Sequence, residues 1–285
     1  MRIGEALAWA KAHGVDRLDA QLLLGHHLRC TRTWLMAHDH DEVPPETQAA
    51  FADDVRRRAD QVPLAYLVGQ REFRGLALTV GPGVLVPRPE TEGLVDWALE
   101  VLSRRGPSSS PPRVIDLGTG SGAIALAIRH AWPAAEVTGT DAQAPALALA
   151  RDNGTRLGLP VRWLQGSWWD PFAGEPFAGE RFDLAVSNPP YISGSDPHLT
   201  ALRHEPRSAL TPEGDGLGAL REIVHGAPAR LARGGWLLLE HGFDQGAAVC
   251  ALLLAAGFDQ VQTRQDLAGL PRCSGACWPN IGSSR

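Results

Sequence analysis

From residue 113 onward, short apolar runs alternate with helix-like segments, and this alternation constrains the fold more than any other feature of the chain. The runs of strand length are RVIDLG, EVTGTD, VRWLQG, FDLAVS and GGWLLLEHG, and segments such as GAIALAIRHAW separate them. Strands that alternate with helices form a largely parallel sheet that is covered by helices on both faces. The sequence therefore predicts an α/β fold for this part of the chain.

The first 70 residues have a helical pattern instead, with many Ala and Leu residues and apolar positions three and four apart. The following stretch, EFRGLALTVGPGVLVPRP, alternates like two short strands around Gly81-Pro82-Gly83, which is typical of a hairpin turn. We therefore divide the chain into an N-terminal helical domain (1–70), a β-hairpin connector (71–90) and an α/β domain (91–285).

Composition limits the partners and the location of the protein. The net charge is −5 and no long basic tract occurs, which argues against extended binding of nucleic acid. No apolar run approaches the roughly 18 residues of a membrane helix, and the N-terminus, with Glu5, lacks a signal-peptide core, so we expect a cytoplasmic protein. The four cysteines lack C-x-x-C spacing, so we expect free thiols and no metal site.

Two stretches have loop-like compositions. Residues 103–113, SRRGPSSSPPR, resemble a linker but are short enough for a surface loop. Residues 171–180, PFAGEPFAGE, are a tandem duplication, which we interpret as a tolerated loop insertion.

The unusual motifs all follow expected strands. DLGTGSG, TD, QGSWW and SNPPY come where strands of the sheet end. Ligands of open α/β sheets bind outside the carboxyl ends of the strands. We therefore expect these four motifs to form one site.

One half of this site has the features of a cofactor pocket. The turn after the first strand contains Gly118, Gly120 and Gly122, and glycines allow a ligand to approach the backbone closely. Their G-x-G-x-G spacing is not that of dinucleotide binders, and glycine turns alone are weak evidence. Asp141, at the end of the next strand, can hold two ribose hydroxyls, and Asp116 is expected to point into the same mouth, where it can attract a cation. Trp168 offers a flat surface for a purine, although surface packing explains Trp168 and Trp169 equally well.

These residues resemble the S-adenosylmethionine-dependent methyltransferases, whose class I members have a Rossmann-like sheet. The resemblance implies that the glycine loop contacts the methionine part of S-adenosylmethionine, Asp141 the ribose and Trp168 the adenine. The implied cofactor-binding residues are Gly118, Thr119, Gly120, Ser121, Gly122, Asp141, Trp168 and Asn188.

The other half of the site is the NPPY segment. Pro189 and Pro190 have fixed φ and no N–H, so the turn is stiff and offers acceptors, the Asn188 Oδ1 and the Pro189 carbonyl. Two acceptors can bind both N–H groups of a planar amide and aim its nitrogen lone pair at a methyl group. Tyr191 can stack on that planar group. We assign catalysis to Asn188, Pro189 and Tyr191, and substrate binding to these three and Pro190; a merely rigid loop is the alternative.

NPPY alone suits both the amino group of adenine and the side-chain amide of glutamine. Longer segments, including PLAYLVGQREFRGL, VLVPRPETEGLV, FDLAVSNPPYI and EPRSALTPEGDGL, resemble the peptide chain release factor N5-glutamine methyltransferases from about residue 60 to 272. The first 60 residues fit the N-terminal domain of that family in length and character only. The resemblance implies methylation of the glutamine in the Gly-Gly-Gln loop of class I release factors, with the helical domain holding the release factor.

Three alternatives stay open. Sister enzymes methylate a glutamine of a ribosomal protein, but they usually carry a different run where this chain has PRPETE. An adenine-N6 methyltransferase acting on nucleic acid is disfavoured by the net charge and by the lack of a basic, aromatic-rich extra domain. A non-catalytic binding module is disfavoured by the intact Asp141, Asn188 and Tyr191.

Overall fold

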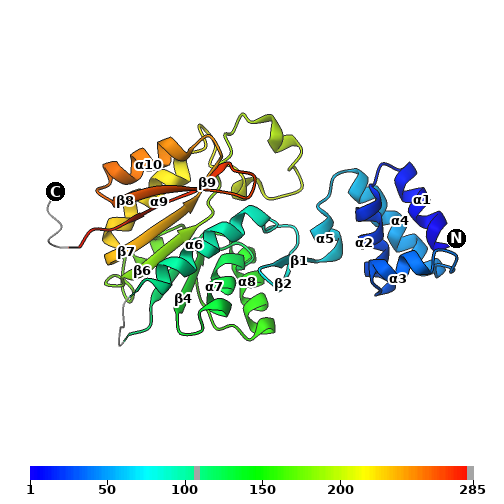
Figure 1. Cartoon of the computed structure of the whole chain (residues 1–285), viewed down its shortest axis with the longest axis horizontal. Coiled ribbons are helices and arrows are strands. Elements are labelled where there is room, and N and C mark those ends of the chain that lie inside the picture. The colour runs from blue at the N-terminus through cyan, green and yellow to red at the C-terminus, as the bar shows by residue number, and fades with distance from the viewer. Residues whose placement is uncertain (106–109, 281–285) are drawn as a thin grey trace. The chain divides into compact units, whose positions relative to one another are not determined.

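The computed structural model describes residues 1–105 and 110–280, which form two compact units (Figure 1). The first consists of residues 1–70 with 80–82, and the second of residues 71–79 with the chain from residue 83. Within the linker-like stretch 103–113, residues 106–109 lie outside the described residues.

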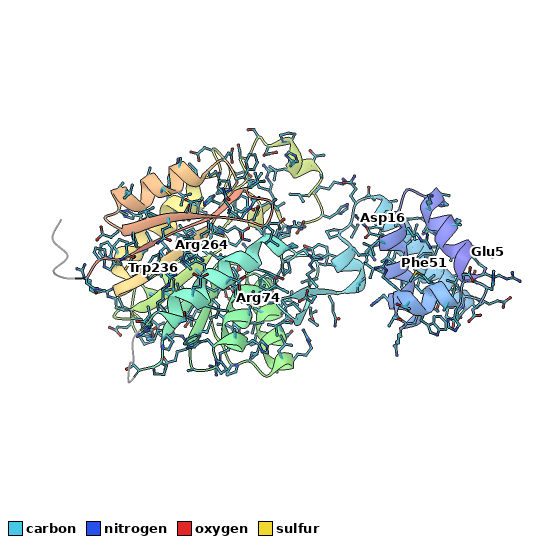
Figure 2. All side chains as sticks on the ribbon, in the orientation of Figure 1. Glu5, Asp16, Phe51, Arg74, Trp236 and Arg264 are labelled. Carbon is cyan, nitrogen blue, oxygen red and sulfur yellow. The ribbon has the colours of Figure 1, made fainter. Side chains whose placement is uncertain are left out.

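The first unit is helical, as predicted. Its helices are α1 (Ile3–Ala12), α2 (Arg17–Leu28), α3 (Arg32–Ala37), α4 (Pro45–Ala59) and α5 (Leu64–Val68). Phe51 of α4 is fully buried at the centre of an apolar cluster to which α1 and α2 also contribute (Figure 2). Asp16 caps α2, because its carboxylate accepts hydrogen bonds from the N–H groups of Leu18 and Asp19.

A hairpin follows, but the predicted position of its turn is wrong. The strands are β1 (Gln70–Phe73) and β2 (Leu76–Thr79), and Arg74 (φ 51°) and Gly75 (φ 78°) form the turn. Two central residues with positive φ suit the twist of a two-residue hairpin. Gly81-Pro82-Gly83 lies after β2, and residues 84–88 form no strand because the N–H of Val86 donates to Glu205 at 3.0 Å instead of to a neighbouring strand.

The second unit contains a seven-stranded sheet in the order β5-β4-β3-β6-β7-β9-β8. The five predicted strands are parallel: β3 (Arg113–Leu117), β4 (Glu136–Asp141), β5 (Arg162–Gln165), β6 (Phe182–Ser187) and β7 (Leu231–Glu240). Two strands that the sequence did not predict, β8 (Asp259–Gln265) and β9 (Pro271–Cys277), pair antiparallel with each other, and β9 pairs antiparallel with β7. The expectation of a largely parallel sheet is confirmed.

Helices cover both faces of this sheet. They are α6 (Glu92–Ser103), α7 (Ala123–Ala131), α8 (Ala144–Leu157), α9 (Gly218–Gly226) and α10 (Gly246–Ala255). One apolar cluster joins α6 and α7 to the sheet and includes Phe73, Leu76 and Leu78 of the hairpin, and a second joins α9 and α10 to the sheet. Across residues 1–105 and 110–280, none of the helices is both long and apolar enough to cross a membrane.

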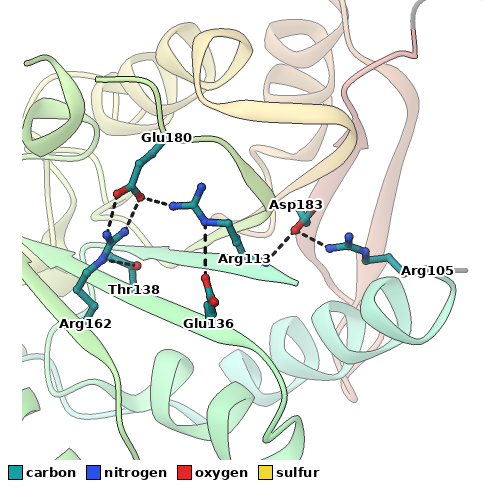
Figure 3. Close-up of polar contacts among 7 residues, drawn as sticks. All are labelled: Arg105, Arg113, Glu136, Thr138, Arg162, Glu180 and Asp183. Atoms are coloured by element: carbon teal, nitrogen blue, oxygen red, sulfur yellow. Dashed lines mark hydrogen bonds and ion pairs between the residues drawn. The ribbon is translucent and has the colours of Figure 1, made fainter. Parts of the chain in front are cut away.

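Ion pairs connect the amino ends of the strands (Figure 3). Glu180 binds Arg162 of β5 through two bonds of 2.8 and 2.6 Å, and Arg113 of β3 through one of 2.5 Å. Glu180 belongs to the duplicated segment, whose Phe172 is fully buried and packs on Phe177. The duplication is therefore part of the packed unit and not a loose insertion.

Candidate active site

A cavity of about 260 Å³ lies at the carboxyl ends of β3, β4 and β6. β3 pairs with β4 on one side and β6 on the other, so this is the point where the order of the sheet reverses and where such folds bind ligands. The expected residues that line it are Gly118, Thr119, Gly120, Ser121, Asp141, Trp168, Asn188 and Pro190. All four motifs therefore bring expected site residues to one cavity.

Gly122 is the expected cofactor-binding residue that does not line the cavity. It precedes α7 with φ 84°, and a Cβ there would meet Trp163, Leu126 and Ala150 at 3.1–3.2 Å. Gly122 thus allows the helix to begin close to its neighbours.

The glycine loop curves around a carboxylate. Gly118 and Gly120 have φ of 72° and 57°, in the region that favours glycine. The Gly120 N–H donates to Asp141 Oδ2 at 2.9 Å, and the Gln143 N–H donates to Oδ1 at 2.9 Å. Burial raises the pKa of Asp141, and these two hydrogen bonds oppose the rise. A Cβ at Gly120 would have no atom within 4 Å, so the backbone here is open to a ligand.

Asp116 does not point into the mouth of the site, which corrects the expectation from sequence. It is fully buried beneath the loop, where its Oδ2 accepts from the Thr119 hydroxyl at 2.6 Å and from the Ala125 N–H at 3.2 Å. Burial raises the pKa of Asp116 to about 7. Its role is to hold the loop against the start of α7.

The two tryptophans after β5 have different surroundings. Trp168, with φ 44°, lines the cavity, and its ring lies against Gly118, where a Cβ would come within 2.9 Å of it. Trp169 is turned inward, and its Nε1 donates to the Ile223 carbonyl at 2.9 Å. Trp168 alone can therefore offer its ring to a ligand.

The NPPY segment lies between this cavity and a second one. Asn188 and Pro190 line both, whereas Pro189 and Tyr191 line only the second. The Tyr191 hydroxyl lies 3.4 Å from Glu240 Oε1, and burial raises the pKa of Tyr191, which stays neutral. A ligand in one cavity and a ligand in the other would meet at Asn188.

Five further residues belong to this site, and sequence reasoning did not place them there. Arg88 lines both cavities and forms an ion pair with the buried Glu205. The others are Thr91 in the first cavity and Glu240 and Arg272 in the second. Arg88 and Thr91 occur in PRPETE, one of the segments that carry the family resemblance, but no spacing relates the five residues to NPPY.

Outside this site, the cysteines of CSGAC lie in β9, where Cys273 and Cys277 are buried free thiols. No group of three or more His, Cys, Asp or Glu residues suited to a metal ion occurs in the part of the chain that the structure describes.

Sequence comparisons identify relatives over almost the whole chain. Residues 5–69 match the family model of the PrmC N-terminal domain, and residues 91–266 match that of the methyltransferase small domain. A release factor glutamine methyltransferase of Bordetella pertussis is 50% identical over 264 residues, which cover 92% of this chain and 95% of the relative. One of Xylella fastidiosa (strain Temecula1) is 49% identical and covers 95% and 97%.

Solved structures share the fold. A methyltransferase from Pyrococcus furiosus superposes with a TM-score of 0.51 and 17% identity, covering 72% of this chain and 90% of that one. The N-terminal domain of human METTL16 in complex with SAH gives a TM-score of 0.54 and 17% identity, covering 81% and 84%. These likenesses confirm the class I methyltransferase fold of the second unit.

Proposed function

The chain belongs to the release factor glutamine methyltransferases, and from that membership we propose that it methylates the side-chain amide nitrogen (N5) of the glutamine in the Gly-Gly-Gln loop of class I release factors, with S-adenosylmethionine as methyl donor. The observation that carries the proposal is that Asn188 and Pro190 line two cavities at once. One cavity suits a nucleoside with an amino-acid tail, and the other suits a side chain that enters from outside.

The residues of the first cavity fit S-adenosylmethionine. The open backbone at Gly120 suits the amino-acid end, the Asp141 carboxylate the ribose hydroxyls, and the Trp168 ring the adenine. When bound, S-adenosylmethionine supplies an electrophilic methyl group on a positively charged sulfur. The glycine loop and Asp141 would hold S-adenosylmethionine in the cavity that Asn188 also lines.

The NPPY segment prepares the amide of the substrate. A glutamine amide nitrogen is a poor nucleophile, because its lone pair is delocalised into the carbonyl. Asn188 Oδ1 and the Pro189 carbonyl accept its two N–H groups and hold the nitrogen in place. Tyr191 packs beside the amide and excludes water. The nitrogen gains the methyl group as the methyl–sulfur bond breaks and its electron pair stays on the sulfur. The proton that the nitrogen loses passes to bulk water, and none of these acceptors needs to ionise.

The helical unit holds the release factor. Its match to the PrmC N-terminal domain and its own apolar core support this role. The domain division proposed from sequence is refined here, since residues 71–79 share the core of the methyltransferase unit. A cytoplasmic location belongs to the same proposal, because release factors act on ribosomes.

The test is methyl transfer from labelled S-adenosylmethionine to a release factor, to the same factor with its loop glutamine changed to alanine, and to an A-rich DNA duplex. We expect label on the intact factor alone. Label on the alanine variant would refute the acceptor atom, and label on the duplex would make the protein an adenine methyltransferase. If none of the three is labelled, a ribosomal protein is the next substrate to test, and its labelling would assign the sister activity.

A further inference from the structure

The orientation of the Asn188 side chain decides whether it can accept a hydrogen bond from the substrate. The oxygen and nitrogen of an asparagine amide have similar shapes, so neighbouring hydrogen bonds determine which way the group faces. Here Nδ2 donates to Thr91 Oγ1 at 3.1 Å. With Nδ2 bound in this direction, Oδ1 is the atom that stays available to a ligand.

Thr91 comes from a distant part of the chain. It ends the short helix η1 (Pro89–Thr91), 97 residues before Asn188, and is 3% exposed. A threonine hydroxyl has one hydrogen and two lone pairs. It can therefore accept from Nδ2 only while its hydrogen points elsewhere.

Glu240 supplies the partner for that hydrogen. It is the last residue of β7 and is 1% exposed; burial raises the pKa of its carboxylate, the Thr91 hydroxyl opposes that rise, and the buried Oε2 has no hydrogen-bond partner among the described residues. An ionised carboxylate only accepts, so it attracts the Thr91 hydroxyl hydrogen and leaves the lone pairs of Oγ1 to accept from Asn188 Nδ2. The Tyr191 hydroxyl, 3.4 Å from Glu240 Oε1, donates to the same carboxylate. All the hydrogens along this line then point from Asn188 and Tyr191 toward Glu240.

We propose that Thr91 and Glu240 are positioning residues that fix the Asn188 amide with Oδ1 toward the substrate. This inference rests on the proposed function, because it assumes a substrate N–H at Asn188. If the Asn188 side-chain amide were rotated by half a turn, Nδ2 would face the substrate N–H. Two hydrogen-bond donors would then oppose each other. Thr91 thus acts through Asn188 and not on the methyl group itself.

The variants Thr91→Val and Thr91→Ser separate the hydroxyl from the shape of the side chain. Valine keeps the volume and removes the hydroxyl, whereas serine keeps the hydroxyl. Thr138→Val is the matched control, since Thr138 is also 3% exposed in the same unit and its hydroxyl binds Arg162 at the amino end of the sheet (Figure 3). Melting temperatures of all variants show whether any loss comes from unfolding.

With a release factor as substrate, we expect Thr91→Val to lower kcat/KM by about 30-fold. A loss of this size corresponds to the removal of one buried hydrogen bond that orients an active-site group. The Kd for S-adenosylmethionine should stay within about threefold, while Thr91→Ser and Thr138→Val keep kcat/KM within about threefold. Wild-type kcat/KM in Thr91→Val would overturn the proposal. Equal losses in Thr91→Val and Thr91→Ser would also overturn it, because shape and not the hydroxyl would then matter.

A second measurement does not depend on the substrate. In ¹⁵N-labelled enzyme, the Asn188 side-chain NH₂ signals, assigned with Asn188→Ala, should exchange slowly with water in the wild type and in Thr91→Ser. In Thr91→Val they should exchange at least about tenfold faster, because the Nδ2 hydrogen bond is absent. Unchanged exchange would refute the contact with Thr91. Failure of the wild type to methylate any release factor would refute the proposed function and leave this result standing.

Discussion

Asn188 shows how one residue can serve both halves of the site. It follows β6 directly, and its position at the end of a parallel strand next to β3 places it at the boundary of the two cavities. Its amide adds no charge, so it can accept a hydrogen bond from a neutral substrate amide without the cost of burying an ion.

Asn188→Ala should therefore affect the transfer step more than cofactor binding. We expect kcat to fall by about 100-fold or more, as for the loss of one preorganised hydrogen-bonding group in an active site. The Kd for S-adenosylmethionine should change less than about threefold. Rate assays beside calorimetric titration measure both, and a near-normal kcat would contradict the role of Asn188.

The acid limb of the pH–rate profile should report Glu240. Burial raises its pKa to about 7, while the hydroxyls of Thr91 and Tyr191 oppose the rise. The charged and titratable groups around it are Tyr191 after β6, Glu90 in η1, and Arg272 and Cys273 in β9. Because the ionised carboxylate of Glu240 is needed to orient Thr91 and, through it, the Asn188 amide, kcat at saturating substrates should rise through pH 7 and be about a tenth of its plateau at pH 6.

Stability should change in the opposite direction over the same range. The folded pKa of Glu240 lies above its ordinary value of 4.5, so its contribution to the free energy of unfolding is present below pH 4.5 and is lost as the pH rises through 7. Glu240→Gln should remove this pH-dependent loss of stability. It should also flatten the acid limb of the pH–rate profile, with a lower kcat at the plateau. Denaturant unfolding of both proteins at pH 5.5 and 8 isolates the difference; an acid limb unchanged in Glu240→Gln would assign it to another group.

The site residues that directly follow strands could be predicted from sequence. Those that come from distant parts of the chain could not. Gly118, Asp141, Trp168 and Asn188 could be found because the ends of neighbouring parallel strands share one edge. Thr91 and Glu240 could not, since no periodicity relates η1 or the last residue of β7 to NPPY. The burial of Asp116 was missed for a similar reason: its partner, the Ala125 N–H, belongs to the first turn of the next helix.

Among the elements, those with an apolar core-facing pattern were predictable and those without one were not. β3, β6 and β7 contain buried apolar runs, and residues 137–140 of β4 are buried as well. β8, DQVQTRQ, is largely polar and exposed, and β9, PRCSGAC, begins with proline and contains small residues. Both are strands because β9 pairs with β7, a tertiary cause that local sequence does not carry. The predicted position of the hairpin turn was wrong because Arg74, although it is not a glycine, takes a positive φ. The turn therefore forms at Arg74 and Gly75 and not at Gly-Pro-Gly.

The duplicated segment allows an internally controlled test of the ion pairs at the amino ends of the strands. Glu180, from the second copy, binds Arg162 and Arg113 (Figure 3). Glu175, at the same place in the first copy, is exposed. Glu180→Gln should lower the free energy of unfolding by about 2 kcal/mol at pH 7, as for hydrogen bonds to charged groups. Glu175→Gln should leave it unchanged.

The pH dependence of that difference has a definite sign. Hydrogen bonds from Arg162 are the largest cause that lowers the pKa of Glu180. Its stabilising effect is therefore present above the ordinary value of 4.5 and is lost as the pH falls through the lowered folded pKa. Chemical denaturation of the two variants at several pH values checks this, and equal stabilities of Glu180→Gln and Glu175→Gln at pH 7 would contradict it.

For the whole molecule, the sequence predicted two regions of different pattern, and the structure has two compact units with separate apolar cores. The boundary was predictable because the periodicity changes near residue 70. The assignment of the hairpin to the second unit was not predictable. Phe73, Leu76 and Leu78 belong to a short segment, and the residues on which they pack lie in α6 and α7. The charge of −5 fits a protein substrate better than a polyanion.

The role proposed for the helical unit predicts a separation of substrate affinity from catalysis. α2 exposes Leu18 and Leu22, one turn apart, at 47% and 36%. Exposed apolar side chains that lie together on one helix face often mark a binding surface for another protein. Leu18→Asp with Leu22→Asp should raise KM for the release factor by about 30-fold, since each leucine buried on binding contributes on the order of 1 kcal/mol.

The same double variant should keep the Kd for S-adenosylmethionine and the melting temperature of the wild type, because neither leucine is buried in the core. Leu254→Asp is the control: it places an aspartate on another exposed leucine, 55% accessible on α10 of the methyltransferase unit. Steady-state kinetics with varied release factor distinguish the outcomes. An unchanged KM in the double variant would exclude this face of α2 from release factor binding, whereas equal increases in both proteins would show a non-specific effect of the added charge.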